Sequence, residues 1–164
     1  MKRVSLLVLL LLIVSLAACA SSDSAESGEM VIENVQANMA MPSDTGSVWV
    51  KITNNTGQDD ALIGAEMAGC GAIELHNMFM ENDVMIMREV EGGQIPIPAG
   101  ETVELKQGGL HIMCIGKEAP LELGSSIDVA LNFTNAGTMT VSATVVEPGT
   151  MNMDGDSGGM KMDN

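Results

Sequence analysis

Aromatic residues and positive charges are scarce in this 164-residue sequence. It has no tyrosine, one tryptophan and two phenylalanines, and only 7 lysines and arginines stand against 22 aspartates and glutamates. With so few aromatics, the core must be built from aliphatic side chains and methionine. The net charge of −15 repels phosphate backbones and anionic lipid headgroups, so we expect no nucleic-acid partner.

Motifs for catalysis and for hard metal ions are also missing. No acid–base pair, Ser-His-Asp set or cofactor-binding loop is visible in the sequence, so we do not expect an enzyme. Calcium or magnesium would need clustered oxygen ligands, and no Asp-x-Asp-x-Asp loop occurs. Structural zinc normally needs closely spaced Cys and His pairs, which this sequence does not supply.

The N-terminus has the parts of an export signal. A charged start, Met1-Lys2-Arg3, precedes an apolar run over residues 4–18 that is too short to cross a bilayer comfortably. Leu16-Ala17-Ala18-Cys19 matches the bacterial lipobox, in which the cysteine is lipidated after cleavage. We therefore predict a signal peptide at 1–18 and an extracytoplasmic, periplasmic lipoprotein anchored to the membrane through Cys19. The alternative is an ordinary signal peptide with a chance cysteine at the cut.

Composition divides the rest of the chain into three parts. Removing residues 1–18 leaves 5 basic and 22 acidic residues, a net charge of −17, on a chain long enough for one domain. Residues 19–29 are predicted to be a lipidated cysteine and a flexible tether, and 30–148 the folded domain. Residues 149–164 form a Met-rich tail that we expect to be disordered. Its two Met-x-Met pairs indicate either compositional drift or, since thioether sulfur prefers soft cations, a weak collector of Cu(I).

Short extended segments alternate with turn residues between positions 30 and 148. Asn135-Ala136-Gly137 is expected to be a hairpin turn between the last two strands, and no convincing amphipathic helix is visible. The pattern is typical of an all-β sandwich or Greek-key barrel of about nine short strands. The strands are expected at 31–35, 48–53, 61–65, 72–79, 84–90, 102–105, 110–115, 127–133 and 139–146.

The only two histidines share a pattern. His76 and His111 each have a methionine two residues later, Met78 and Met113, which chance would give to both in roughly 1% of shuffled sequences. Residues i and i+2 of a strand lie on one face, so each pair can present imidazole and thioether together. Met85-Ile86-Met87 again places two methionines on one face. These soft donors select copper, and Cu(I) above all.

Other interpretations of these residues stay open. The methionines could fill an apolar core of an adhesive or structural module. A blue-copper electron carrier would need a thiolate such as Cys114, which lies on the opposite strand face from His111 and Met113. Cys70 and Cys114 could form a disulfide outside the cytoplasm, but nothing in the sequence indicates that they are close, so buried free thiols are favoured.

Five segments together resemble the periplasmic copper chaperones called PCuAC, over roughly residues 30–147. The PCuAC signature is His-x10-Met-x21-His-x-Met. His76 to Met87 fits the first spacing, whereas two extra residues separate Met87 from His111. We expect the extra pair in a hairpin turn at Glu91-Gly92-Gly93-Gln94, where insertion costs little. The segments are Leu75–Met78, Val84–Val90, Ile97–Gly100, Leu105–Met113 and Ala119–Leu121.

The resemblance implies a cupredoxin-like β-barrel that binds one Cu(I) through His76, Met87, His111 and Met113. Met78 and Met85 would be neighbours or reserve ligands, and Cys114 would pack beside the site without binding metal. It also implies delivery of copper to the CuA site of cytochrome c oxidase, with a Sco-type thiol protein as a further partner. Copper storage or tolerance is the alternative role.

Overall fold

Ten β-strands build the described part of the chain, residues 28–149 of this computed structural model. The expected signal peptide, the lipidated cysteine, most of the tether and residues 150–164 lie outside it. Within residues 28–149 the only helical piece is the 3₁₀ turn η1, Glu91–Gly93, and no helix there has the length and apolarity to cross a membrane. The strands are β1 Met30–Asn38, β2 Thr45–Asn54, β3 Asp60–Met67, β4 Ala72–Glu81, β5 Val84–Glu89, β6 Ile95–Ile97, β7 Thr102–Leu105, β8 His111–Ile115, β9 Ser126–Phe133 and β10 Thr138–Val145.

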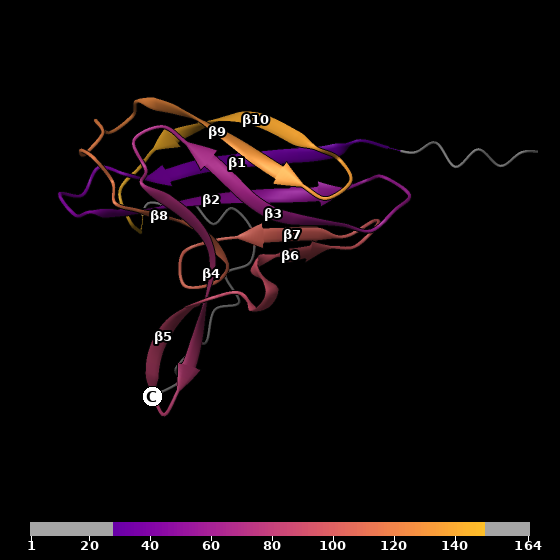
Figure 1. Cartoon of the computed structure of the whole chain (residues 1–164), viewed down its shortest axis with the longest axis horizontal. Coiled ribbons are helices and arrows are strands. Elements are labelled where there is room, and N and C mark those ends of the chain that lie inside the picture. Colours follow the sequence, from indigo (N-terminus) through magenta and orange to yellow (C-terminus); the bar gives the residue numbers. More distant parts are fainter. Residues whose placement is uncertain (1–27, 150–164) are drawn as a thin grey trace, which may run out of the picture.

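The strands form one curled sheet in the order β5-β4-β8-β2-β1-β10-β9-β3-β6, with β7 also paired to β2. All pairs are antiparallel except β1 with β10. The sheet does not close, but it folds over so that β3 also contacts β4. The all-β fold class is therefore confirmed, with ten strands where about nine were expected (Figure 1).

Aliphatic and methionine side chains fill the interior, as the lack of aromatics predicts. The buried cluster includes Met30, Met39 and Met67 beside valines, leucines and isoleucines, and Phe133 is its only aromatic member. Trp49 is buried as well, but it lies outside this cluster. Since β2, β4 and β8 each turn one face to this core, their other faces are available for function.

The unpredicted strand, β6, contains a proline. Pro96 pairs with Ala61 of β3, and β6 is the last strand at that end of the sheet. A proline lacks the N–H needed for a ladder on both sides, so it is tolerated only at such an edge. The proline hides the strand pattern of this segment, although Ile95 and Ile97 are buried.

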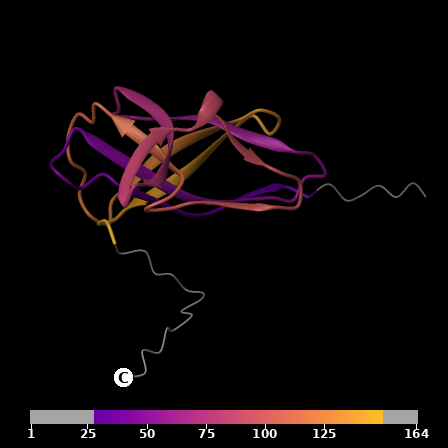
Figure 2. The ribbon, with the colours of Figure 1, turned by 90° about the horizontal axis from the view of Figure 1, so that it is seen from below.

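The β4–β5 hairpin projects away from the other strands (Figure 1), and Figure 2 shows the molecule from the side toward which it points. Its two-residue turn is Asn82-Asp83, and both residues have positive φ, 50° and 62°. This is the type I′ geometry that matches the twist of a hairpin, and Asn and Asp tolerate it better than most residues. The turn fixes the register at Glu81 opposite Val84.

Two local expectations were wrong. The segment Glu91–Gln94 is not a hairpin turn, because β5 pairs with β4 whereas β6 pairs with β3; η1 carries the chain between them. Cys70 and Cys114 are not free thiols, because they form a disulfide across 44 residues of sequence with their Cα atoms 5.6 Å apart. Pairing of β4 with β8 brings the loop before β4 next to Cys114, a proximity that local sequence cannot reveal.

Candidate metal centre

One face of three neighbouring strands gathers the histidines and methionines singled out in the sequence. Residues directly opposite on adjacent strands point to the same side of a sheet. On β4 and β8, His76 stands opposite His111. On β4 and β5, Met78 stands opposite Met87. Met113 follows His111 by two residues and therefore shares this face. We call it the donor face.

The hydrogen bonds of His111 define which ring nitrogen is free. Its Nδ1 lies 2.8 Å from the carbonyl oxygen of Gly109, which can only accept, so Nδ1 carries the proton. In the neutral ring Nε2 is then unprotonated, and it lies 3.2 Å from the thioether sulfur of Met87. Neither atom has a proton to give the other. Two electron-pair donors therefore converge, as they do when a metal ion binds between them.

In His76 the other ring nitrogen, Nε2, is the one anchored by a hydrogen bond. Its Nε2 donates to the carboxylate of Glu74 at 2.7 Å, so in the neutral ring Nδ1 is the nitrogen without a proton. That Nδ1 is buried and has no hydrogen-bond partner among the described residues. The two rings meet edge to face with centroids 5.9 Å apart. Each histidine thus has one anchored and one free nitrogen, the arrangement typical of metal-binding histidines.

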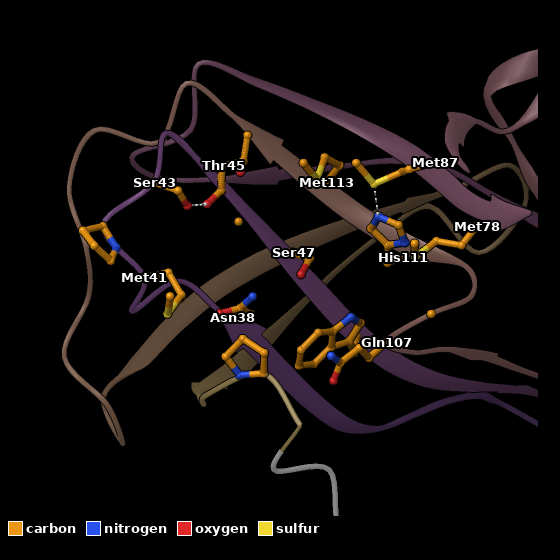
Figure 3. Close-up of a pocket in the computed structure, with 15 residues that line it drawn as sticks. Asn38, Met41, Ser43, Thr45, Ser47, Met78, Met87, Gln107, His111 and Met113 are labelled. Atoms are coloured by element: carbon orange, nitrogen blue, oxygen red, sulfur yellow. Dashed lines mark hydrogen bonds between the residues drawn. The ribbon is translucent and has the colours of Figure 1, made fainter. Parts of the chain in front are cut away.

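Met87, Met113 and His111 line a groove of about 450 Å³, and Met78 lines it too (Figure 3). His76 contacts His111 edge to face but does not line the groove. Met87 is 43% exposed, so this candidate ligand is reachable from solvent. The groove is also lined by Asn38, Met41, Pro42, Ser43, Thr45, Gly46, Ser47, Trp49, Gln107, Gly108 and Pro148.

Burial keeps His111 neutral. Desolvation lowers the pKa of its imidazole below 6.5, the hydrogen bond to the Gly109 carbonyl opposes this, and a proton on His76 would lower the pKa further. A neutral imidazole is the form that binds a metal ion. Within residues 28–149, no three His, Cys, Asp or Glu side chains gather into a metal site. The candidate ligands at this face are imidazole nitrogen and thioether sulfur, which suit a soft cation.

The structure thus brings together His76, Met87, His111 and Met113, and their role as ligands stays a prediction. Met78 lies beside them, whereas Met85 stands farther along the hairpin, opposite Met80. Glu74 and the Gly109 carbonyl were missed by sequence reasoning. Glu74 could have been found, because it lies two residues before His76 and so shares its face.

Cys114 points away from the donor face. It is fully buried in the core cluster and bonded to Cys70. A disulfide sulfur is not a thiolate, so the blue-copper interpretation that depends on Cys114 is contradicted. The interpretation of the methionines as core also fails for Met85 and Met87, since both are exposed.

Solved structures with the same fold are PCuAC domains. The copper-bound PCuAC domain from PmoF2 superposes with a TM-score of 0.61 at 20% identity, over 74% of this chain and 96% of that one. The Cu(I) form of DR1885 from Deinococcus radiodurans gives a TM-score of 0.56 at 26% identity, over 79% of this chain and 86% of that one. The resemblance drawn from the sequence is confirmed by these structures.

The sequence comparisons agree on one family. Residues 30–145 match the family described as "Putative lipoprotein LpqE-like". A relative from Leifsonia xyli subsp. xyli, "Putative lipoprotein Lxx21020", is 34% identical over 126 residues, which cover 74% of this chain and 75% of that protein. The chain therefore belongs to the LpqE-like lipoprotein family, and its domain has the cupredoxin-like fold of the PCuAC copper-binding domains.

Proposed function

We propose that this domain is an extracytoplasmic copper chaperone that binds one Cu(I) ion through His76, Met87, His111 and Met113. A single observation carries the proposal: the unprotonated Nε2 of His111 faces the Met87 sulfur at 3.2 Å. The buried, unpartnered Nδ1 of His76 supports it from the neighbouring strand. An unpartnered buried nitrogen is costly in the apo protein, and a bound cation would relieve that cost.

The donor set suits a carrier rather than a permanent site. Four neutral donors leave the copper ion its charge, and no thiolate holds it. An acceptor that offers cysteine sulfur can therefore draw the ion away. The exposed thioether of Met87 gives such an acceptor a ligand that it can displace first.

The acceptor is proposed to be the CuA site of cytochrome c oxidase, with a Sco-type thiol protein as a further partner. Support comes from likeness to the PCuAC domains and to the Cu(I) form of DR1885. The lipoprotein names of the family and of the Leifsonia relative support an anchor at Cys19 on the extracytoplasmic side of the membrane. An anchored carrier would meet a membrane-bound oxidase in the same plane.

Copper binding is tested by titrating the domain with Cu(I) against a chromogenic chelator. Wild type should take up one ion tightly, and the His76→Ala/His111→Ala double variant should lose that complex. Asp128→Ala, at an exposed position on β9 away from the donor face, is the matched control and should bind as wild type does. Unchanged tight binding in the double variant would refute the proposal.

Delivery is tested separately. The Cu(I)-loaded domain is mixed with the apo soluble fragment of an oxidase subunit that carries the CuA site, with and without a reduced Sco-type protein. Copper should move to the fragment, where the CuA absorption reports it. Retention of all copper by the domain under both conditions would instead favour storage or tolerance.

A further inference from the structure

The β4–β5 hairpin carries methionines that lie outside the apolar core. No residue of β5 is buried, and the hairpin projects from the sheet (Figure 1). Met80 is 64% exposed and Met85 45% exposed. An exposed thioether contributes little to folding, because burial of apolar surface is what stabilises a methionine. The apolar-core explanation that fits Met30 or Met67 therefore does not apply here.

All four methionines of this hairpin lie on the donor face. Met78 stands opposite Met87, and Met80 stands opposite Met85. The other face holds no methionine: it carries Phe79 opposite Ile86, and Arg88, which pairs with Glu81 and covers the Phe79 ring. From Met78 and Met87 outward to the turn, one face of the hairpin therefore carries the methionines, and the other face carries the apolar and charged side chains.

The register arranges these methionines as two cross-strand pairs, Met78 with Met87 and Met80 with Met85, which we call rungs. Cross-strand neighbours have Cβ atoms about 5 Å apart, and successive rungs on one face are about 7 Å apart. Flexible methionine side chains can bridge both separations. The rung of Met78 and Met87 borders the groove with His111, and the rung of Met80 and Met85 lies one step nearer the exposed turn.

We propose that Met80 and Met85 form an accessory thioether site for a soft monovalent cation, which receives the ion before it passes to the histidine pair. We call these two residues the outer rung. Two neutral thioethers bind such an ion weakly, which is what a receiving site requires. Met78 and Met87 then offer sulfur on the way to His111. That the ion is Cu(I) rests on the proposed function; the site itself rests on the hairpin register.

The test uses Ag(I), a redox-inert soft cation, and NMR of the domain labelled at its methionine methyl groups. In wild type, the first equivalent should shift the methyl signals of Met87 and Met113, and further Ag(I) should shift those of the outer rung. In His76→Ala/His111→Ala the outer-rung signals should still shift. Buried Met39, which is 1% exposed, is the internal control and should not respond.

The kinetic test measures stopped-flow loading from a Cu(I)–chelator complex. Met80→Leu/Met85→Leu removes both sulfurs at nearly constant volume. It should load several-fold more slowly than wild type, with the final 1:1 affinity unchanged. Val84→Leu/Ile86→Leu alters the other face of the same hairpin and should load at the wild-type rate.

Two results would overturn the accessory site: outer-rung methyl signals that stay fixed in excess Ag(I), or equal loading rates for both double variants. Neither result bears on the main site. Conversely, retention of the tight 1:1 complex by His76→Ala/His111→Ala would refute the proposed function, while the outer-rung signals would still report on the accessory site.

Discussion

Glu74 lies two residues before His76 on β4 and accepts a hydrogen bond from its Nε2 at 2.7 Å. This contact decides which nitrogen of His76 faces inward. A carboxylate behind a metal-binding histidine fixes the ring tautomer and raises the basicity of the free nitrogen. Glu74 is thus the clearest supporting residue of the proposed copper site, although it donates nothing to the metal.

Replacing Glu74 by alanine should weaken Cu(I) binding by about 10- to 100-fold, because the ring of His76 loses its anchor. Glu66→Ala removes an exposed acid from β3 and serves as the control for the change in charge. Competition against a chelator at fixed pH measures both variants. Equal affinities for the two would show that the Glu74 contact does not support the site.

Acidification should destabilise the apo domain through His111. Burial lowers the pKa of His111 in the folded state below 6.5. As pH falls past 6.5, the unfolded chain takes up a proton before the folded one does, so the contribution to stability begins to fall there. It is lost completely once pH drops below the folded-state pKa. Urea unfolding of wild type and His111→Gln between pH 7.5 and 4.5 checks this: the variant should show the smaller slope, and parallel curves would contradict it.

Asp60 should govern stability at lower pH. Burial acts to raise the pKa of its carboxyl, but the backbone N–H groups of Asn135, Ala61 and Ala136 outweigh burial and hold the pKa below 3.8. The contribution of Asp60 is present above that value and lost as pH falls through the folded-state pKa.

Asp60→Ala should therefore cost about 1–3 kcal/mol at neutral pH, because buried donors lose their acceptor. Asp128→Ala, at an exposed position on β9, should cost little. Denaturant unfolding at pH 7 measures both. A cost for Asp60→Ala no larger than that of the control would be incompatible with this role of the carboxylate.

The disulfide should be a large source of stability. Cys70 and Cys114 close a loop with a sequence separation of 44, for which the chain-entropy treatment gives about 4 kcal/mol, within the usual range for native disulfides. The Cys70→Ala/Cys114→Ala variant should lose roughly that amount in urea unfolding. Adding reductant should destabilise wild type but not the variant. If reductant moved both unfolding midpoints equally, or neither, the prediction would fail.

Most strands of this fold could be predicted because their signal is local. Alternation of apolar and polar residues and well-placed turns such as Asn135-Ala136-Gly137 indicated nine of the ten strands. The strand β6 was missed because Pro96 is tolerable only at a sheet edge, and whether a segment lies at an edge depends on the whole topology. The disulfide was missed for the same reason: its two cysteines meet only through the pairing of β4 with β8.

The sequence by itself determined that each histidine shares a strand face with the methionine two residues later, because side chains alternate with a period of two. It also placed Cys114 on the opposite strand face from His111 and Met113. Only the tertiary structure decided that β4 lies between β5 and β8, which places His76 opposite His111 and Met87 within 3.2 Å of the free imidazole nitrogen. Strand order and register come from burying the opposite face of the same strands, so the site is positioned by core residues such as Leu75 and Ile112, which lie on that opposite face.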